Sequence, residues 1–349
     1  MHVHSDDRRF MLLLACALLA VAILGVMAGS SLRDGEAAAA VAPVDRGGSV
    51  QTVRAENSVA RIEAVGPQPL LQQFLTSRFE ERFPELARAV RPRLSPLQDT
   101  LIVSYYGNPY SPNMGILGKA DPQTIAARLE EQAARYDELN GPLRVMPAFH
   151  LVYAVAQPHP AADGRYLYYM DDADVREYVA LAEERDALLF LDLQIGRSSV
   201  EAELQRVLPY LRYDNVHLAL DPEFAVALGE VPGAIFGSLH ADDINRAQTL
   251  LQQLVDTEHL PPKLLIVHQF VDSMVLEGDA IQRYPDVDLV LDVDGFGPAA
   301  VKRAIYGRYA SRPYAYHAAV KLFFEQDPDL MSELDVLSLE PRPSIVIYQ

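Results

Sequence analysis

The chain has 349 residues, of which 50% are hydrophobic and 22% charged, a composition typical of a globular protein rather than a disordered one. Its net charge of -18 argues against a nucleic-acid partner, because binding to a phosphate backbone needs clustered Lys and Arg. The single cysteine, Cys16, lies in an N-terminal apolar run, so the rest of the chain has no disulfide and no thiolate chemistry.

The N-terminal apolar run extends from Phe10 to Ala28 and follows Arg8 and Arg9. It is just long enough to span a bilayer, which takes about 20 residues, and the basic pair before it predicts that the chain after it is exported. We expect either an uncleaved signal anchor, which tethers the protein to the membrane, or a signal peptide that is removed. Lipidation of Cys16 is a third alternative. All three predict an extracytoplasmic protein, on the cell surface or the periplasmic side, which is secreted if the signal is cleaved.

The chain after this run divides into two parts by composition. Residues 29–68 show no sustained apolar period, which predicts a flexible linker. An amphipathic helical pattern starts at residue 69 and is followed by regular apolar runs. The expected organisation is therefore a signal anchor or signal peptide at 1–28, a linker at 29–68 and a single domain at 69–349.

Within the domain, strand-like apolar runs alternate with helix-like stretches. The eight predicted strands are 101–106, 145–153, 188–193, 216–220, 264–267, 287–293, 319–324 and 344–348. The helices predicted between them are 122–139, 172–185, 200–211, 241–257 and 298–310. This alternation predicts βαβ units in a parallel sheet, and eight units in about 250 residues predict a (β/α)8 TIM-type barrel. An open doubly wound parallel sheet is the alternative, and the apolar run 234–237 is a ninth strand candidate.

Polar side chains stand at the ends of most predicted strands, where barrel enzymes carry their active sites. They are Tyr105, Tyr106, His150, Asp192, Gln194, Asp221, Glu223, His268, Gln269, Asp292, Asp294, Lys321 and Glu325. Asp221 and Glu223 share one strand face, and Pro222 between them is expected to end the strand. Buried carboxylates are unfavourable unless they are paired, so several acids on converging strand ends indicate a site.

The paired acids fit glycoside hydrolysis, which uses two carboxyl groups across the scissile bond. Glu223 is the predicted general acid, with its pKa raised by Asp221, and Asp294 or Glu325 is the predicted base or nucleophile. Lys321 is also expected to form an ion pair with an acid such as Glu325. The substrate is expected to be a carbohydrate or cell-envelope glycan, and its predicted binding residues are Tyr105, Tyr106, His150, Asp192, Gln194, His268, Gln269, Asp292 and Lys321.

The same side chains permit two other functions. The first is a metal-dependent hydrolase, whose ligands would be drawn from His150, Asp192, Asp221, Glu223, His268 and Asp292. No His-x-His or His-Glu-x-x-His motif supports it, and no nucleotide-binding loop is present, so the preferred prediction has no metal and no cofactor. The second is a surface barrel that binds a ligand without catalysis.

Two resemblances to known proteins accompany these patterns. Asp-Pro-Glu at 221–223 resembles the Asp-x-Glu that ends the fourth strand of exported barrel glycosidases of the chitinase and muramidase types, which implies a glycoside hydrolase. Leu218-Ala219-Leu220 stands where chitinases carry further acids. Residues 100–349 also resemble a set of exported bacterial proteins of unassigned function, a resemblance that implies no activity. It rests on the stretches 106–109, 114–118, 220–224 and 292–297.

Overall fold

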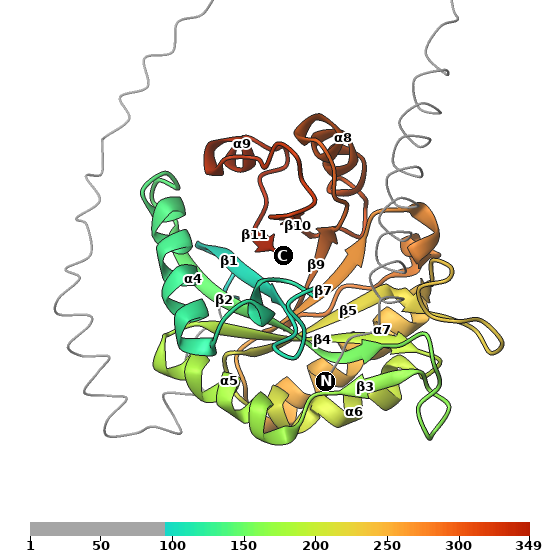
Figure 1. Cartoon of the computed structure of the whole chain (residues 1–349). Coiled ribbons are helices and arrows are strands. Elements are labelled where there is room, and N and C mark those ends of the chain that lie inside the picture. Colours follow the sequence, from blue (N-terminus) through green and yellow to red (C-terminus); the bar gives the residue numbers. More distant parts are fainter. Residues whose placement is uncertain (1–94) are drawn as a thin grey trace, which may run out of the picture. The chain divides into compact units, whose positions relative to one another are not determined.

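The computed structural model describes residues 95–349 of the chain (Figure 1). The predicted anchor or signal at 1–28, the linker at 29–68 and the predicted start of the domain at residue 69 lie outside these residues. Among the described residues, none of the helices is both long enough and apolar enough to cross a membrane.

Eight parallel strands close into a barrel (Figure 1). They are β1 (Thr100–Gly107), β2 (Arg144–Ala156), β4 (Leu188–Gly196), β5 (Val216–Ala225), β7 (Lys263–Gln269), β9 (Val287–Val293), β10 (His317–Leu322) and β11 (Ile345–Tyr348). Each pairs with the next in this order, and β11 pairs with β1 to close the ring. The predicted (β/α)8 barrel is therefore confirmed, and the open doubly wound sheet is wrong.

Helices between successive strands cover the outside of the barrel (Figure 1). They are α4 (Pro122–Asp137), α5 (Asp172–Glu184), α6 (Val200–Leu211), α7 (Ala241–Glu258), α8 (Ala299–Tyr309) and the short α9 (Glu333–Leu337). Capping residues set where some of them begin: the Asp121 side chain accepts a hydrogen bond from the backbone N–H of Thr124 at 3.0 Å, at the start of α4. The five helices predicted from the sequence are all present, with ends that agree to within two residues.

Smaller elements lie in the loops. The three short strands are β3 (Leu167–Tyr169), antiparallel to β2, and β6 (Leu239–His240) with β8 (Val275–Leu276), which pair with each other. The 3-10 turns are η1 (Ile116–Gly118), η2 (Asp272–Met274) and η3 (Gly278–Ala280). The run 234–237 forms no barrel strand and lies in the loop after β5, where Ile235 makes an isolated bridge with Pro232.

Strand β5 passes through Pro222 and ends at Ala225, so the prediction that Pro222 ends the strand is wrong. On one side, β7 pairs with β5 only as far as Leu220. On the other side, the register with β4 shifts between Gln194 and Gly196, beyond the residue pair that includes Asp221. Pro222 therefore lies where neither neighbour needs its missing N–H, which is the kind of place where a strand tolerates proline.

Alternation along the strands separates the apolar residues into two layers. Outward-facing residues such as Leu218 and Leu220 of β5 pack beneath the helices. Inward-facing residues such as Ile102, Ala219 and Ile266 fill the barrel. Full burial of an aliphatic side chain of this size contributes about 1.5–3 kcal/mol, so both layers stabilise the fold. Toward the carboxyl ends of the strands, the inward-facing positions change from apolar to polar.

Candidate functional site

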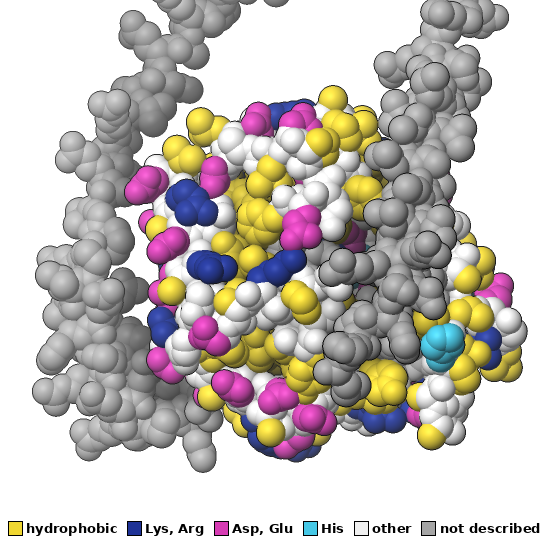
Figure 2. Space-filling model, in the orientation of Figure 1, with side chains coloured by type: hydrophobic (Ala, Val, Ile, Leu, Met, Phe, Trp, Pro, Cys, Tyr) yellow, Lys and Arg dark blue, Asp and Glu magenta, His cyan; other side chains and the backbone are white. Residues whose placement is uncertain are grey.

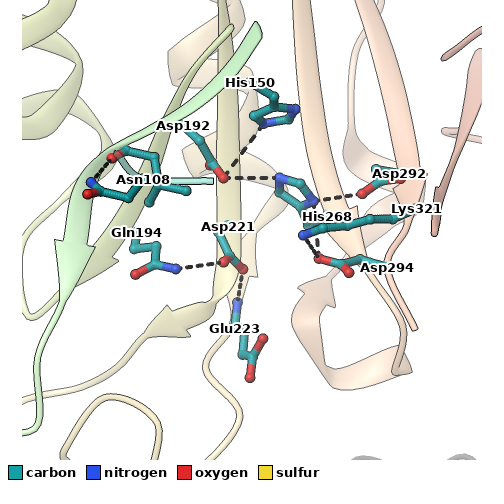
Figure 3. A network of polar contacts seen from close by, with 11 residues as sticks. Asn108, His150, Asp192, Gln194, Asp221, Glu223, His268, Asp292, Asp294 and Lys321 are labelled. Carbon is teal, nitrogen blue, oxygen red and sulfur yellow. Dashed lines mark hydrogen bonds and ion pairs between the residues drawn. The ribbon is translucent and has the colours of Figure 1, made fainter. Parts of the chain in front are cut away.

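The polar inward-facing residues come from six neighbouring strands and meet inside the barrel mouth (Figure 3). They are His150 on β2, Asp192 and Gln194 on β4, Asp221 and Glu223 on β5, His268 on β7, Asp292 and Asp294 at the end of β9, and Lys321 on β10. Asp192, His268 and Asp292 are fully buried, and even Glu223 is only 8% exposed. Buried charges need compensation from neighbours, so the contacts among these groups decide their protonation.

His268 lies at the centre of the cluster (Figure 3). Its Nδ1 is 2.8 Å from Asp292 Oδ2 and 3.3 Å from Asp294 Oδ2, and its Nε2 is 3.3 Å from Asp192 Oδ2. Burial lowers the pKa of His268, but the three carboxylates outweigh burial and raise this pKa well above its usual range. His150 Nε2 lies 3.7 Å from Asp192 Oδ2, and burial holds the pKa of His150 below its usual range.

The neighbours of Asp192 and Asp294 favour the ionised form of both carboxyl groups. Burial raises the pKa of Asp192, but His268 and His150 outweigh it and bring the pKa below its usual range. Lys321 Nζ donates a hydrogen bond to Asp294 Oδ2 at 2.9 Å. Burial again raises the pKa of Asp294, and Lys321 and His268 more than reverse that effect. The predicted ion pair of Lys321 therefore exists, with Asp294 rather than Glu325 as its partner.

The pKa values of Asp221 and Glu223 shift in the opposite direction, upward. Burial, with the charges of Asp192 and Asp294, raises the pKa of Asp221 to about 7. Burial, with the charges of Asp221 and Asp294, raises the pKa of Glu223 well above its usual range. The Asp221 carboxylate accepts hydrogen bonds from the Glu223 backbone N–H at 3.0 Å and from Gln194 Nε2 at 3.4 Å. Glu223 is thus held as a neutral carboxylic acid beside ionised groups.

Tyr106 faces the same interior, one position beyond Tyr105. Its ring lies edge-on to the His150 ring, with centroids 4.9 Å apart, and Lys321 Nζ lies 3.6 Å from its centroid. Burial and the charges of nearby acids raise the pKa of Tyr106 well above its usual range. Ser104, which the predicted site residues did not include, is fully buried two residues before Tyr106 on β1 and therefore on the same strand face.

Three predicted site residues lie away from this cluster. Tyr105 faces outward, where its ring contacts those of Phe324 and Tyr348, and the outward-facing Gln269 accepts a hydrogen bond from Tyr314. Glu325 lies in the loop after β10, with its side chain 65% exposed and 2.6 Å from Lys119. Tyr105 and Glu325 line a pocket of about 470 Å³ beside α4. The structure therefore leaves Glu325 outside the barrel mouth, whereas Asp294 lies in the mouth together with Glu223 (Figure 3).

Two groups of side chains within the described residues have the spacing of metal ligands. The first is His150, Asp192 and His268, and the second is His268, Asp292 and Asp294; within each group the ligand atoms lie within 4.8 Å of one another. Asp221 and Glu223 belong to neither group. The mouth therefore contains an acid–carboxylate arrangement around Glu223 and Asp294, and a separate His/Asp cluster centred on His268.

Comparisons with known proteins give only distant similarities. No protein-family model matches the chain, and no curated protein sequence matches it. Similar solved structures include a broad-specificity endoglucanase of glycoside hydrolase family 5 from Clostridium longisporum, with TM-score 0.39 and 9% identity over 72% of this chain and 86% of that one. A family 18 chitinase from Pseudoalteromonas aurantia has TM-score 0.32 and 10% identity over 71% and 93%. A hyperthermophilic endo-β-1,4-glucanase, solved with substrate, has TM-score 0.28 and 9% identity over 62% and 80%. These neighbours are glycoside hydrolases, and similarity at this level carries no argument about the reaction of this chain.

Proposed function

We propose that the barrel is an extracytoplasmic hydrolase of the glycosidase type, which cleaves a carbohydrate or cell-envelope glycan with two carboxyl groups. The observation that carries the proposal is the contrast between Glu223 and Asp294. Glu223 is buried, with no hydrogen-bond partner for its Oε1 among the described residues, whereas Asp294 is paired with an ammonium group at 2.9 Å. Environments that separate two carboxyl groups in this way assign one as acid and the other as base.

The chemistry follows from these protonation states. Glu223 donates its proton to the glycosidic oxygen as the bond to the anomeric carbon breaks, so the leaving sugar departs as an alcohol. Asp294 either attacks the anomeric carbon or takes a proton from the attacking water, which corresponds to the retaining or the inverting reaction. Asp221 is a positioning residue, because its carboxylate accepts a hydrogen bond from the Glu223 backbone N–H.

Charge and aromatic side chains favour a sugar substrate without many negative charges. The chain carries a net charge of -18, which repels polyanions. On the face shown in Figure 2, Lys and Arg side chains lie among acidic and hydrophobic ones rather than in one basic patch. Tyr110, just after β1, is 54% exposed, and Tyr168, on β3 beside the carboxyl end of β2, is 67% exposed, and exposed aromatic rings can stack on sugar faces.

The location outside the cytoplasm is part of the proposal and depends on the apolar run after Arg8 and Arg9. Extracytoplasmic glycans, including those of the cell envelope, are the carbohydrates that an exported barrel meets. Fusion of a reporter enzyme that is active only outside the cytoplasm to the C-terminus tests this placement. Reporter activity supports export, and a reporter that is active only in the cytoplasm contradicts it.

The activity is tested by incubating the full chain with a panel of oligosaccharides and cell-envelope glycans and measuring new reducing ends. We expect hydrolysis of at least one substrate, and loss of that hydrolysis in Glu223→Gln. Glu325→Gln is the matched control, because it makes the same chemical change outside the barrel interior. No hydrolysis of any member of the panel, or a Glu223→Gln variant as active as wild type, contradicts the proposal.

A further inference from the structure

The Nε2 side of His268 faces buried polar atoms that have no hydrogen-bond partner. Both ring nitrogens of His150, both carboxylate oxygens of Asp192 and Nε2 of His268 make no hydrogen bond to any described residue, and their contacts with one another are 3.3 Å or longer. All three side chains are fully buried. Native proteins satisfy nearly all buried polar atoms, so unpartnered atoms on three converging side chains call for a ligand between them.

The distances between these atoms suit a metal ion. Asp192 Oδ2 lies 3.3 Å from His268 Nε2 and 3.7 Å from His150 Nε2. Zinc binds nitrogen and oxygen at about 2.0–2.2 Å, and a tetrahedral arrangement then places its ligand atoms about 3.3–3.6 Å from one another. Hydrogen bonds from nitrogen to oxygen are most often about 2.9–3.0 Å long. The observed spacing therefore fits the edges of a coordination shell better than it fits hydrogen bonds.

The other ring nitrogen of His268, Nδ1, has a close carboxylate partner, as the second ring nitrogen of a metal-bound histidine almost always has. Nδ1 makes a contact of hydrogen-bond length, 2.8 Å, with Asp292 Oδ2. In the neutral ring, which is the form that binds a metal ion, an Nδ1–H that donates to Asp292 leaves the lone pair of Nε2 pointing toward Asp192 and His150. Histidine ligands of metals almost always have such a carboxylate or carbonyl partner on the other ring nitrogen, which orients the ring and fixes its tautomer.

The charge balance also favours a cation at this place. Three carboxylates, those of Asp192, Asp292 and Asp294, lie within 3.3 Å of His268, and Lys321 directly contacts only Asp294 among them. A proton on His268 would compensate one of the two remaining charges and leave His150 without a partner. A divalent cation would compensate both and would supply a partner for His150 as well.

We infer that His150, Asp192 and His268 bind one divalent first-row metal ion, with zinc as the probe of choice. Two imidazoles and one carboxylate are ligands that suit zinc, iron(II) and manganese. In the register of β4 and β5, Asp192 pairs with Ala219 and Gln194 pairs with Asp221, so the metal site lies one layer deeper in the barrel than Asp221 and Glu223. The inference goes beyond the proposed hydrolysis and does not depend on it.

The test is zinc binding by the full chain without any substrate. The purified protein is stripped with a chelator and titrated with Zn²⁺, and bound zinc and the melting temperature are measured. We expect one zinc per chain and a melting temperature that rises with zinc. Asp192→Asn and His150→Gln should weaken binding at least about tenfold, and Asp292→Asn about 10–100-fold, as for other partners of metal-bound histidines. His240→Gln is the control, because it alters a surface histidine that also lies 3.3 Å from a carboxylate, that of Glu277.

Wild-type protein that binds no stoichiometric zinc would overturn the inference, as would unchanged binding in Asp192→Asn and His150→Gln. If either of these variants fails to fold, the wild-type stoichiometry and the Asp292→Asn variant, which keeps all three ligands, decide the question. Glu223→Gln should bind zinc as wild type does, because Glu223 contacts none of the three ligands. Hydrolysis without zinc binding would overturn this inference alone, and zinc binding without hydrolysis would overturn the proposed function alone.

Discussion

Replacing Lys321 with methionine should strongly destabilise the barrel. The Lys321 ammonium is 2.9 Å from Asp294 Oδ2, and the two side chains are only 4% and 10% exposed. The ammonium also lies 3.6 Å from the centroid of the Tyr106 ring. Methionine keeps an unbranched apolar side chain of similar length but has no charge. The variant therefore leaves Asp294 buried without its closest cation, while the packing of the stem changes little.

The expected loss is set by the burial of the pair. Removing one partner of a buried ion pair typically costs about 3–5 kcal/mol, because the other charge is left uncompensated. Lys119→Met is the matched control, since Lys119 also contacts a carboxylate, that of Glu325 at 2.6 Å, with side chains that are 32% and 65% exposed. An exposed pair of this kind contributes at most about 1 kcal/mol. The two lysine variants should thus differ by at least about 2 kcal/mol in their free energy of unfolding.

Urea unfolding of the full chain measures this difference, with circular dichroism as the signal because the chain has no Trp. The double variant Lys321→Met/Asp294→Asn should recover most of the loss, since neither charge is then left unpaired. Equal losses in Lys321→Met and Lys119→Met would refute the reasoning. A double variant no more stable than Lys321→Met would refute it as well, because the loss would then come from packing.

Two further predictions concern the acid Glu223 and the glycines Gly115 and Gly307. Burial raises the pKa of Glu223 from its usual 4.5, so Glu223 keeps its proton in the folded state at pH values where it has lost the proton in the unfolded state. The wild type therefore loses stability as the pH rises above about 4.5 toward the pKa of the folded state. Glu223→Gln should therefore gain melting temperature relative to wild type between pH 4 and pH 8, and a constant difference would contradict the raised pKa. Gly115→Ala should cost about 1–3 kcal/mol, because φ is +124° and the new Cβ would lie 2.4 Å from the Tyr106 carbonyl oxygen. Gly307 lies in α8 with open space around it, so Gly307→Ala should instead stabilise the protein by about 0.5–1 kcal/mol. A urea midpoint that is higher for Gly115→Ala than for Gly307→Ala would contradict the geometry of the loop at Gly115.

The barrel was predictable because its apolar runs have a clear period and clear ends. The same period placed pairs such as Asp192 with Gln194 and Asp221 with Glu223 on one face, and the structure brings both pairs into the interior. The alternation of side chains along a strand could not show which of two adjacent polar residues faces the barrel interior. Tyr105 and Tyr106 are both compatible with a strand end, and only the assembled barrel shows that Tyr106 is the one that faces inward.

Other features depend on neighbours that a single strand does not reveal. Glu325 follows β10, which ends at Leu322, and the alternation of a strand no longer holds in the loop that carries it. The contact between Lys321 and Asp294 joins two strands, so the correct partner was visible only after β9 and β10 were paired. Pro222 remains inside β5 because of the pairing limits of β4 and β7, which no local pattern encodes.

The central claim is that Glu223 donates the proton to the leaving group, and the leaving group itself provides the most direct test. Two substrates with the same sugar are compared, one with a sugar alcohol as leaving group and one with a dinitrophenolate, which departs without a proton. We predict that Glu223→Gln lowers kcat/KM, which reports the departure of the leaving group, about 10²–10⁴-fold on the first substrate and leaves kcat/KM on the second nearly unchanged. Equal losses on the two substrates, or no loss on either, would contradict the account.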